Sequence, residues 1–211
     1  MSTVGEKPDG LPGIRILDTH ASGHRGRLRF LASPDPHEDA VFRQWQASCL
    51  DTLTPQQRDA LRKWTTAFHS RIQRQLGGGR LSEEVLGIVW QMDLALISNP
   101  LPVDRVLHRC TDLLFFGAHT ELELLAMVGA VREATGYLAT GVARGTSVRG
   151  GEVTLELLAP RGTPGLFISP LAPPEARGQG ELLIARKQRY RILEAAFTDD
   201  GILVRVLLMG G

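Results

Sequence analysis

The chain has 211 residues, which is enough for one well-packed domain or for two small ones. Apolar residues make up 43% and charged residues 22%, a composition typical of globular proteins rather than of disordered or fibrous ones. The longest apolar runs are much shorter than the roughly 18 residues that cross a bilayer, which excludes a transmembrane helix. A net charge of +1 argues against a strongly basic nucleic-acid binder.

The first 36 residues are rich in Gly, Pro, Asp, His and Arg and have almost no apolar periodicity, so we expect a loosely ordered leader. The leader lacks the apolar stretch of a secretory signal, and we therefore expect no classical export. Cys49 and Cys110 are the only cysteines, too few for a disulfide framework or a zinc cage.

Three helices are predicted in the amino-terminal half. Apolar residues at every fourth position over 41–49 predict the first. Thr54 and Gln57 have the spacing of a capping box, so a second helix is expected to start there and to end at the three glycines 77–79. The third is predicted over residues 82–99.

The carboxyl-terminal half instead shows short apolar segments separated by Gly, Pro or Asp, which is typical of strands. A short helix is expected near residues 120–128. Helices followed by a run of strands predict an α+β fold whose strands form two packed, mainly antiparallel sheets. The predicted strands are residues 105–110, 136–142, 152–159, 165–169, 181–185, 189–197 and 202–209.

Two of these strands carry polar residues that need an explanation. Arg109 shares one side of an apolar strand with Leu107, so its charge requires an anionic partner. That partner is either a buried carboxylate or a phosphate, which suits the forked guanidinium. Thr140 stands between Ala139 and Gly141, whose small size permits the close approach of a ligand, although a strand meeting a tight turn has the same pattern.

Gln179 and Glu181 are two residues apart at the start of a predicted strand, so we expect their side chains to face the same way. An amide beside a carboxylate can hydrogen-bond to hydroxyl groups and stabilise nearby positive charge. A solvated strand edge is the alternative interpretation.

The six histidines show no metal-binding spacing, so no metal is expected, and the chain has no P-loop, dinucleotide-binding or serine-hydrolase motif.

Taken in order, Arg109, Ala139-Thr140-Gly141 and Gln179-Gly180-Glu181 resemble the pattern of the mono-ADP-ribosyltransferase exoenzymes and toxins. The family pattern is Arg, then Ser-Thr-Ser, then Glu/Gln-x-Glu. Residues 178–192 resemble the Rho-modifying exoenzymes in particular. The resemblance begins at about residue 54.

The surrounding sequence carries the resemblance further. Residues 60–65 and 72–76 resemble the family's opening helix, and residues 157–168 resemble the strand–turn–strand before its catalytic loop. The fold that this implies is ADP-ribosyltransferase-like, with its sheets around an NAD cleft, in a catalytic domain over residues 37–211.

The family uses NAD as co-substrate, and nicotinamide leaves the ribose through an oxocarbenium-like state. The resemblance implies that Arg109 holds the NAD phosphates and that Thr140 binds within the NAD cleft and braces its strand. It implies that Glu181 hydrogen-bonds the nicotinamide ribose and stabilises the developing cation, while Gln179 orients the acceptor. The implied activity is that of a glycosyltransferase, with NAD glycohydrolysis as a side activity.

The sequence departs from the family pattern at Ala139, where the first Ser usually braces the catalytic Glu. No aromatic residue lies between Gly141 and Val153, where a ring usually packs on nicotinamide. Gln179 implies a non-arginine acceptor, since Glu-x-Glu accompanies arginine acceptors in the family. Rho is not expected as the acceptor, because residues 173–177 lack the aromatic that Rho modifiers present.

The expected acceptor is a macromolecule, in the first place a protein. The protein is expected to act as a toxin or effector, and it is either cytoplasmic in the producing cell or delivered into a target cell by a specialised secretion route. An immunity protein or a chaperone is a further expected partner, and no membrane partner is expected. Two alternatives stay open: ADP-ribosylation of a nucleic-acid base, and a catalytically weak NAD-fold module that acts through binding alone.

Overall fold

The structure, a computed structural model, describes residues 35–143 and 151–209. The expected leader therefore lies outside the described residues, except for Asp35 and Pro36, which begin α1 (Pro36–Ser48). The Asp35 carboxylate accepts a hydrogen bond of 2.7 Å from the backbone N–H of His37, and Pro36 occupies the first helical position. Both features favour a helix start at this point.

The predicted second helix is two helices, α2 (Pro55–Trp64) and α3 (Phe68–Gly77). The capping box of Thr54 and Gln57 is present as predicted. The break follows from two threonines, since the hydroxyls of Thr65 and Thr66 donate to the carbonyls of Arg62 and Lys63 at 2.9 and 2.7 Å. These local bonds compete with the helical ladder and end α2.

Helix α4 (Glu83–Ile97) starts at Ser82, whose side chain accepts from the backbone N–H of Val85. A short helix, α5 (Glu121–Ala126), follows the first strand. In the described part of the chain, none of the helices combines the length and apolar character that a membrane crossing requires.

Eight described strands form one sheet in the order β2-β7-β8-β4-β1-β3-β6-β5. All neighbouring pairs are antiparallel except β4 and β8. The structure thus confirms the α+β class. The strands are β1 (Arg105–Thr111), β2 (Val131–Ala134), β3 (Leu138–Gly141), β4 (Val153–Ala159), β5 (Gly165–Phe167), β6 (Glu181–Ile184), β7 (Gln188–Thr198) and β8 (Gly201–Met209).

The two sheets expected from the sequence are joined through β1 and β3, where His108 opposite Gly141 is the single registered pair. The ladder is much longer on either side: β1 and β4 share seven registered pairs and β3 and β6 share four. The site residues predicted on β1 and β3 therefore lie at the narrow junction between two better-paired halves.

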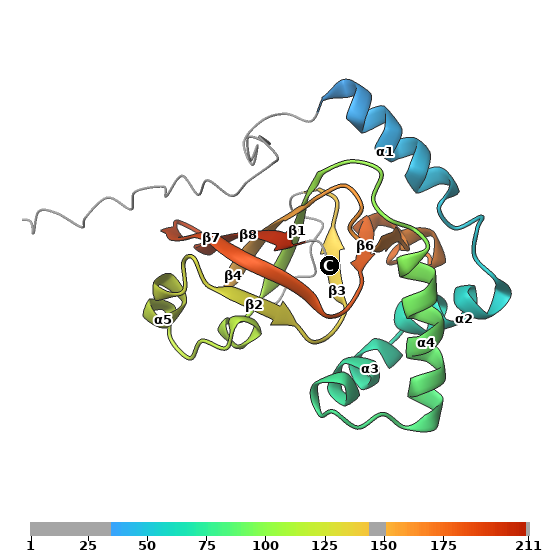
Figure 1. The fold of residues 1–211 in the computed structure, drawn as a ribbon, viewed down its shortest axis with the longest axis horizontal. Coiled ribbons are helices and arrows are strands. Elements are labelled where there is room, and N and C mark those ends of the chain that lie inside the picture. Colours follow the sequence, from blue (N-terminus) through green and yellow to red (C-terminus); the bar gives the residue numbers. More distant parts are fainter. Residues whose placement is uncertain (1–34, 144–150, 210–211) are drawn as a thin grey trace, which may run out of the picture. The chain divides into compact units, whose positions relative to one another are not determined.

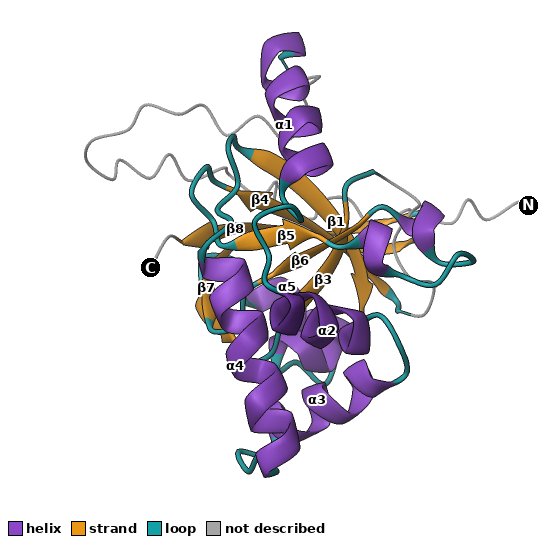
Figure 2. Ribbon diagram, turned by 90° about the vertical axis from the view of Figure 1, so that its right-hand side faces the viewer, coloured by secondary structure: helices purple, strands orange, loops and turns teal. Residues whose placement is uncertain are grey.

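Helices α2, α3 and α4 gather on one side of the sheet, as the two views in Figures 1 and 2 show. Their buried residues, including Leu61, Trp64 and Met92, pack with Tyr137 and Leu183 into one apolar cluster. A second cluster fills the opposite face around Leu107 on β1 and includes Leu124 of α5. Because successive residues of a strand point to opposite faces, β3 and β6 contribute side chains to both clusters.

Candidate active site

Arg109 lies on β1 beside the buried Leu107, as the strand alternation predicts. Its Nη1 donates a hydrogen bond of 3.3 Å to the carbonyl of Ala139, and its Cζ lies 5.5 Å from the centroid of the Phe115 ring. Its buried Nε finds no hydrogen-bond partner among the described residues. Burial lowers the pKa of Arg109 from its usual value, and the nearby charges of Asp112 and Glu181 act in the opposite direction.

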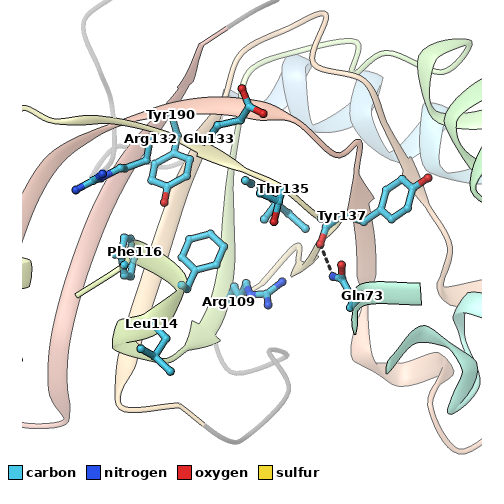
Figure 3. Close-up of a pocket in the computed structure, with 14 residues that line it drawn as sticks. Gln73, Arg109, Leu114, Phe116, Arg132, Glu133, Thr135, Tyr137 and Tyr190 are labelled. Carbon is cyan, nitrogen blue, oxygen red and sulfur yellow. Dashed lines mark hydrogen bonds between the residues drawn. The ribbon is translucent and has the colours of Figure 1, made fainter. Parts of the chain in front are cut away.

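A cavity of about 520 Å³ opens beside this guanidinium. In Figure 3, Arg109 lies between Gln73 and the more distant Phe116, and the ring that its guanidinium contacts is that of Phe115. Tyr190 and Arg132 close another part of the wall. The volume is within the range of roughly 300–1,000 Å³ typical of small-molecule sites. The combination of aromatic surface and a cation suits a ligand that has both a ring and a negative charge.

Glu181 is the first residue of β6 and is half-buried. Its backbone N–H donates to the hydroxyl of the buried Ser169 at 2.7 Å, and its carboxylate accepts the indole N–H of Trp64 at 3.1 Å. Burial raises the pKa of Glu181 above its usual value, while the Trp64 hydrogen bond and the charges of His69 and Arg109 oppose the rise. Arg109 and Glu181 are therefore electrostatic neighbours, although Glu181 is not part of the cavity lining.

Thr140 is buried on β3, and its hydroxyl donates a hydrogen bond of 2.7 Å to the carbonyl of Leu182 on β6. This bond ties β3 to the residue that follows Glu181. The hydroxyl is thus engaged with the protein backbone rather than lining the cavity.

Gln179 is placed differently from the expectation that it begins a strand. It ends a short 3₁₀ turn, Arg177–Gln179, and is exposed, while Gly180 has a φ of 62° before β6 begins at Glu181. The alternation that would align Gln179 with Glu181 therefore does not apply, because it holds only within a strand. The prediction that Gln179 and Glu181 share one face of a strand is wrong, while the role of Gln179 stays a prediction.

Trp64 and Gln73 both make contacts at the site that the sequence did not reveal. Gln73 Nε2 donates to the carbonyl of Tyr137 at 2.8 Å, and a side chain at Gly136 would collide with the Gln73 amide. Both residues lie in the segments that resemble the family's opening helix. That resemblance was the one sequence signal that could have pointed to them. Within the described residues, no group of three His, Cys, Asp or Glu side chains could hold a metal ion.

Residues 40–204 match the model of the ADP-ribosyltransferase exoenzyme family. Comparison of the sequence with those of curated proteins finds no match. The structure is similar to that of Plx2a, an ADP-ribosyltransferase toxin from Paenibacillus larvae, with a TM-score of 0.70 and 20% identity. The match covers 82% of this chain and 96% of Plx2a.

Two further solved structures are similar over most of their length. The Clostridium limosum C3 exoenzyme matches with a TM-score of 0.71 and 21% identity, covering 82% of this chain and 94% of that one. The S. aureus protein C3stau2, whose structure was solved with NAD, matches with a TM-score of 0.68 and 18% identity, covering 82% and 96%. At these identities the structural likeness establishes the fold.

Proposed function

Because the chain belongs to the ADP-ribosyltransferase exoenzyme family, we propose that it moves ADP-ribose from NAD to a non-arginine side chain of a target protein, with Arg109 and Glu181 at the centre of the site. NAD is the co-substrate, as the family activity and the NAD-bound relative C3stau2 imply. The proposed catalytic domain is residues 37–211, preceded by the leader.

The observation that carries the proposal is the state of Arg109. Within residues 35–143 and 151–209, no carboxylate lies within ion-pairing distance of its guanidinium. Its Nε is buried without a partner, and the side chain lines a cavity of about 520 Å³. A half-buried cation whose Nε is buried and unused is costly unless a ligand supplies the anion. The pyrophosphate of NAD is an anion of the kind that a guanidinium fork binds.

Glu181 supplies the second half of the chemistry. The glycosidic bond between the ribose and nicotinamide breaks, nicotinamide leaves with the electron pair, and positive charge develops on the ribose. A carboxylate held beside that position stabilises the charge, an electrostatic effect that is usually the largest single contribution to catalysis. The acceptor side chain then bonds to the ribose carbon and gives up its proton.

Gln179 is the proposed acceptor-orienting residue. Its side chain is exposed at the end of the 3₁₀ turn Arg177–Gln179, directly before Glu181. An exposed amide at that position can meet a macromolecule, whereas the buried Thr140 cannot. When no acceptor is present, water takes its place, which gives NAD glycohydrolase as a side activity. Delivery to a target cell by a specialised secretion route belongs to the same proposal.

Incubation of the protein with NAD labelled in its adenylate part and with target-cell lysate tests the proposal. We expect labelled protein, unaffected by nuclease, and no labelling with the variant Glu181→Gln. Label that nuclease removes would assign the acceptor to nucleic acid. If neither transfer nor nicotinamide release occurs in the parent protein, the alternative of a module that acts through binding alone is correct.

A further inference from the structure

We propose that Trp64 is the positioning residue for Glu181, and that its indole N–H fixes the carboxylate in the orientation that the reaction needs. The inference rests on the proposed function, because it assigns Trp64 a role in the same reaction. The contact joins α2 to β6 across 117 positions of sequence, with 3.1 Å between Trp64 Nε1 and Glu181 Oε1.

Among the described residues, the neighbouring strand β3 offers Glu181 no side-chain donor on this face. In the β3–β6 pair, Gly141 lies directly opposite Glu181 and Ala139 lies opposite Leu183. Opposed residues of an antiparallel pair share a face, and alternation puts Ala139 on that face as well. Neither residue has a polar side chain. Among the described residues, Trp64 is the one that donates a hydrogen bond to the carboxylate.

Trp64 is itself held firmly. It is the last residue of α2 and is only 3% exposed. Its ring packs edge-on against Tyr137, with 5.3 Å between the ring centroids and an interplanar angle of 75°. The Tyr137 hydroxyl in turn donates to Asp93 at 2.7 Å. An indole has a single donor and no acceptor, so a ring fixed in this way directs its N–H at one place.

The consequence concerns the charge next to Glu181. Arg109 is close enough to influence the Glu181 carboxylate electrostatically, yet the two side chains form no ion pair. Opposite charges in a partly buried site attract one another strongly. The Trp64 bond holds the carboxylate toward α2, and the Ala139 carbonyl holds the guanidinium. The two charged groups thus have separate hydrogen-bond partners, which leaves Glu181 available for the ribose and Arg109 available for the phosphates.

The test is the variant Trp64→Phe, which removes the N–H and keeps an aromatic ring in the same place. We expect kcat for nicotinamide release to fall roughly ten- to a hundredfold, with KM for NAD changed by less than about threefold. Trp45→Phe is the matched control, since Trp45 is a partly buried tryptophan outside the site that packs against both apolar clusters. Its kcat should stay within about twofold of the parent.

Rescue separates the hydrogen bond from simple packing. Adding Ala139→Ser to Trp64→Phe places a hydroxyl on the face of β3 that Glu181 shares, and we expect it to restore most of the lost turnover. If the double variant is no faster than Trp64→Phe, or if Trp64→Phe behaves like Trp45→Phe, the inference is overturned. Glu181→Gln in the same assay keeps the two proposals apart. If Glu181→Gln is inactive while Trp64→Phe is fully active, only the role of Trp64 is refuted. If Glu181→Gln is fully active, the proposed function is refuted.

A measurement on the intact indole covers the case in which Trp64→Phe does not fold. The chain has three tryptophans and so gives three indole N–H signals in a ¹⁵N-correlated spectrum. The Glu181→Gln change should move the Trp64 signal and leave those of Trp45 and Trp90 in place. A Trp64 signal that does not move refutes the contact on which the inference depends.

Discussion

Replacing Arg109 with lysine is expected to weaken NAD binding although the charge is kept. The guanidinium has one donor on the Ala139 carbonyl at 3.3 Å and a buried Nε without a partner, so further donors remain for a phosphate. A lysine ammonium cannot reproduce two parallel bonds to one anion. A hydrogen bond to a charged group is worth about 1.5–3 kcal/mol, so losing one of two should raise Kd roughly ten- to a hundredfold.

The effect of the same change on stability should be small. The bond to the Ala139 carbonyl is long, and the contact with the Phe115 ring, at 5.5 Å, is a weak one. Together they amount to about 1 kcal/mol, which corresponds to a melting-temperature loss of roughly 2–4 °C for a domain of this size. If Arg109 were instead half of a buried ion pair, Arg109→Lys would cause a large loss of stability and little change in NAD affinity.

Calorimetric titration with NAD beside a thermal melt separates these cases. The matched control is Arg205→Lys, because Arg205 pairs with Glu156 and Glu194 at 2.9 and 2.7 Å and lies on β8, away from the cavity lining. The control should lower the melting temperature and leave the NAD affinity unchanged. An Arg109→Lys protein that binds NAD as tightly as the parent would refute the phosphate-binding role.

Three further outcomes are expected. Gln179→Ala should reduce labelling of the acceptor roughly ten- to a hundredfold and leave nicotinamide release to water nearly unchanged; equal losses would place Gln179 in the NAD site instead. Thr140→Val removes the bond to the Leu182 carbonyl and should lower the melting temperature by roughly 2–4 °C, whereas Thr140→Ser should not, and identical melts of the two variants would contradict this. Glu181→Gln should melt higher than the parent at pH 7, because burial raises the pKa of Glu181 and its ionised form therefore costs stability. Between the ordinary carboxyl pKa of 4.5 and the raised pKa of Glu181 in the folded protein, the folded parent binds more protons than its unfolded state. The stability of the parent therefore falls as the pH rises from the lower pKa to the higher one. The difference between the two proteins should shrink toward about pH 4, and a constant difference would refute the assignment.

Local signals predicted much of the fold. The Thr54–Gln57 capping box and the Ser82 cap mark the starts of α2 and α4, because these side chains bond to backbone groups only a few residues away. Strands β4 and β8 were recognisable because most of their residues are apolar. Strand β2 was missed, since three of its four residues are exposed at the edge of the sheet and show no apolar alternation.

The site was less predictable than the fold, since its decisive contacts are distant in sequence. Arg109 could be singled out because a charge in an apolar strand is unusual, yet the choice between a carboxylate and a ligand needed the three-dimensional surroundings. The Trp64–Glu181 bond has no local signature, because any acceptor would satisfy a buried indole. Gln179 was misplaced because Gly180, in the left-handed region, ends a turn where strand alternation was assumed.

The electrostatics of the site run against the stability of the fold. Arg109 has an unpartnered buried Nε, and the pKa of Glu181 is raised by its burial, so both charges are held at a cost. The two side chains form no ion pair with each other and have separate partners, the Ala139 carbonyl and the Trp64 indole. Such an arrangement persists only if the surrounding packing outweighs it, and the two apolar clusters on either face of β3 and β6 provide that packing. Arg109 thus keeps unused hydrogen-bond donors for a negative pyrophosphate. Glu181 keeps a negative charge for a ribose on which positive charge develops.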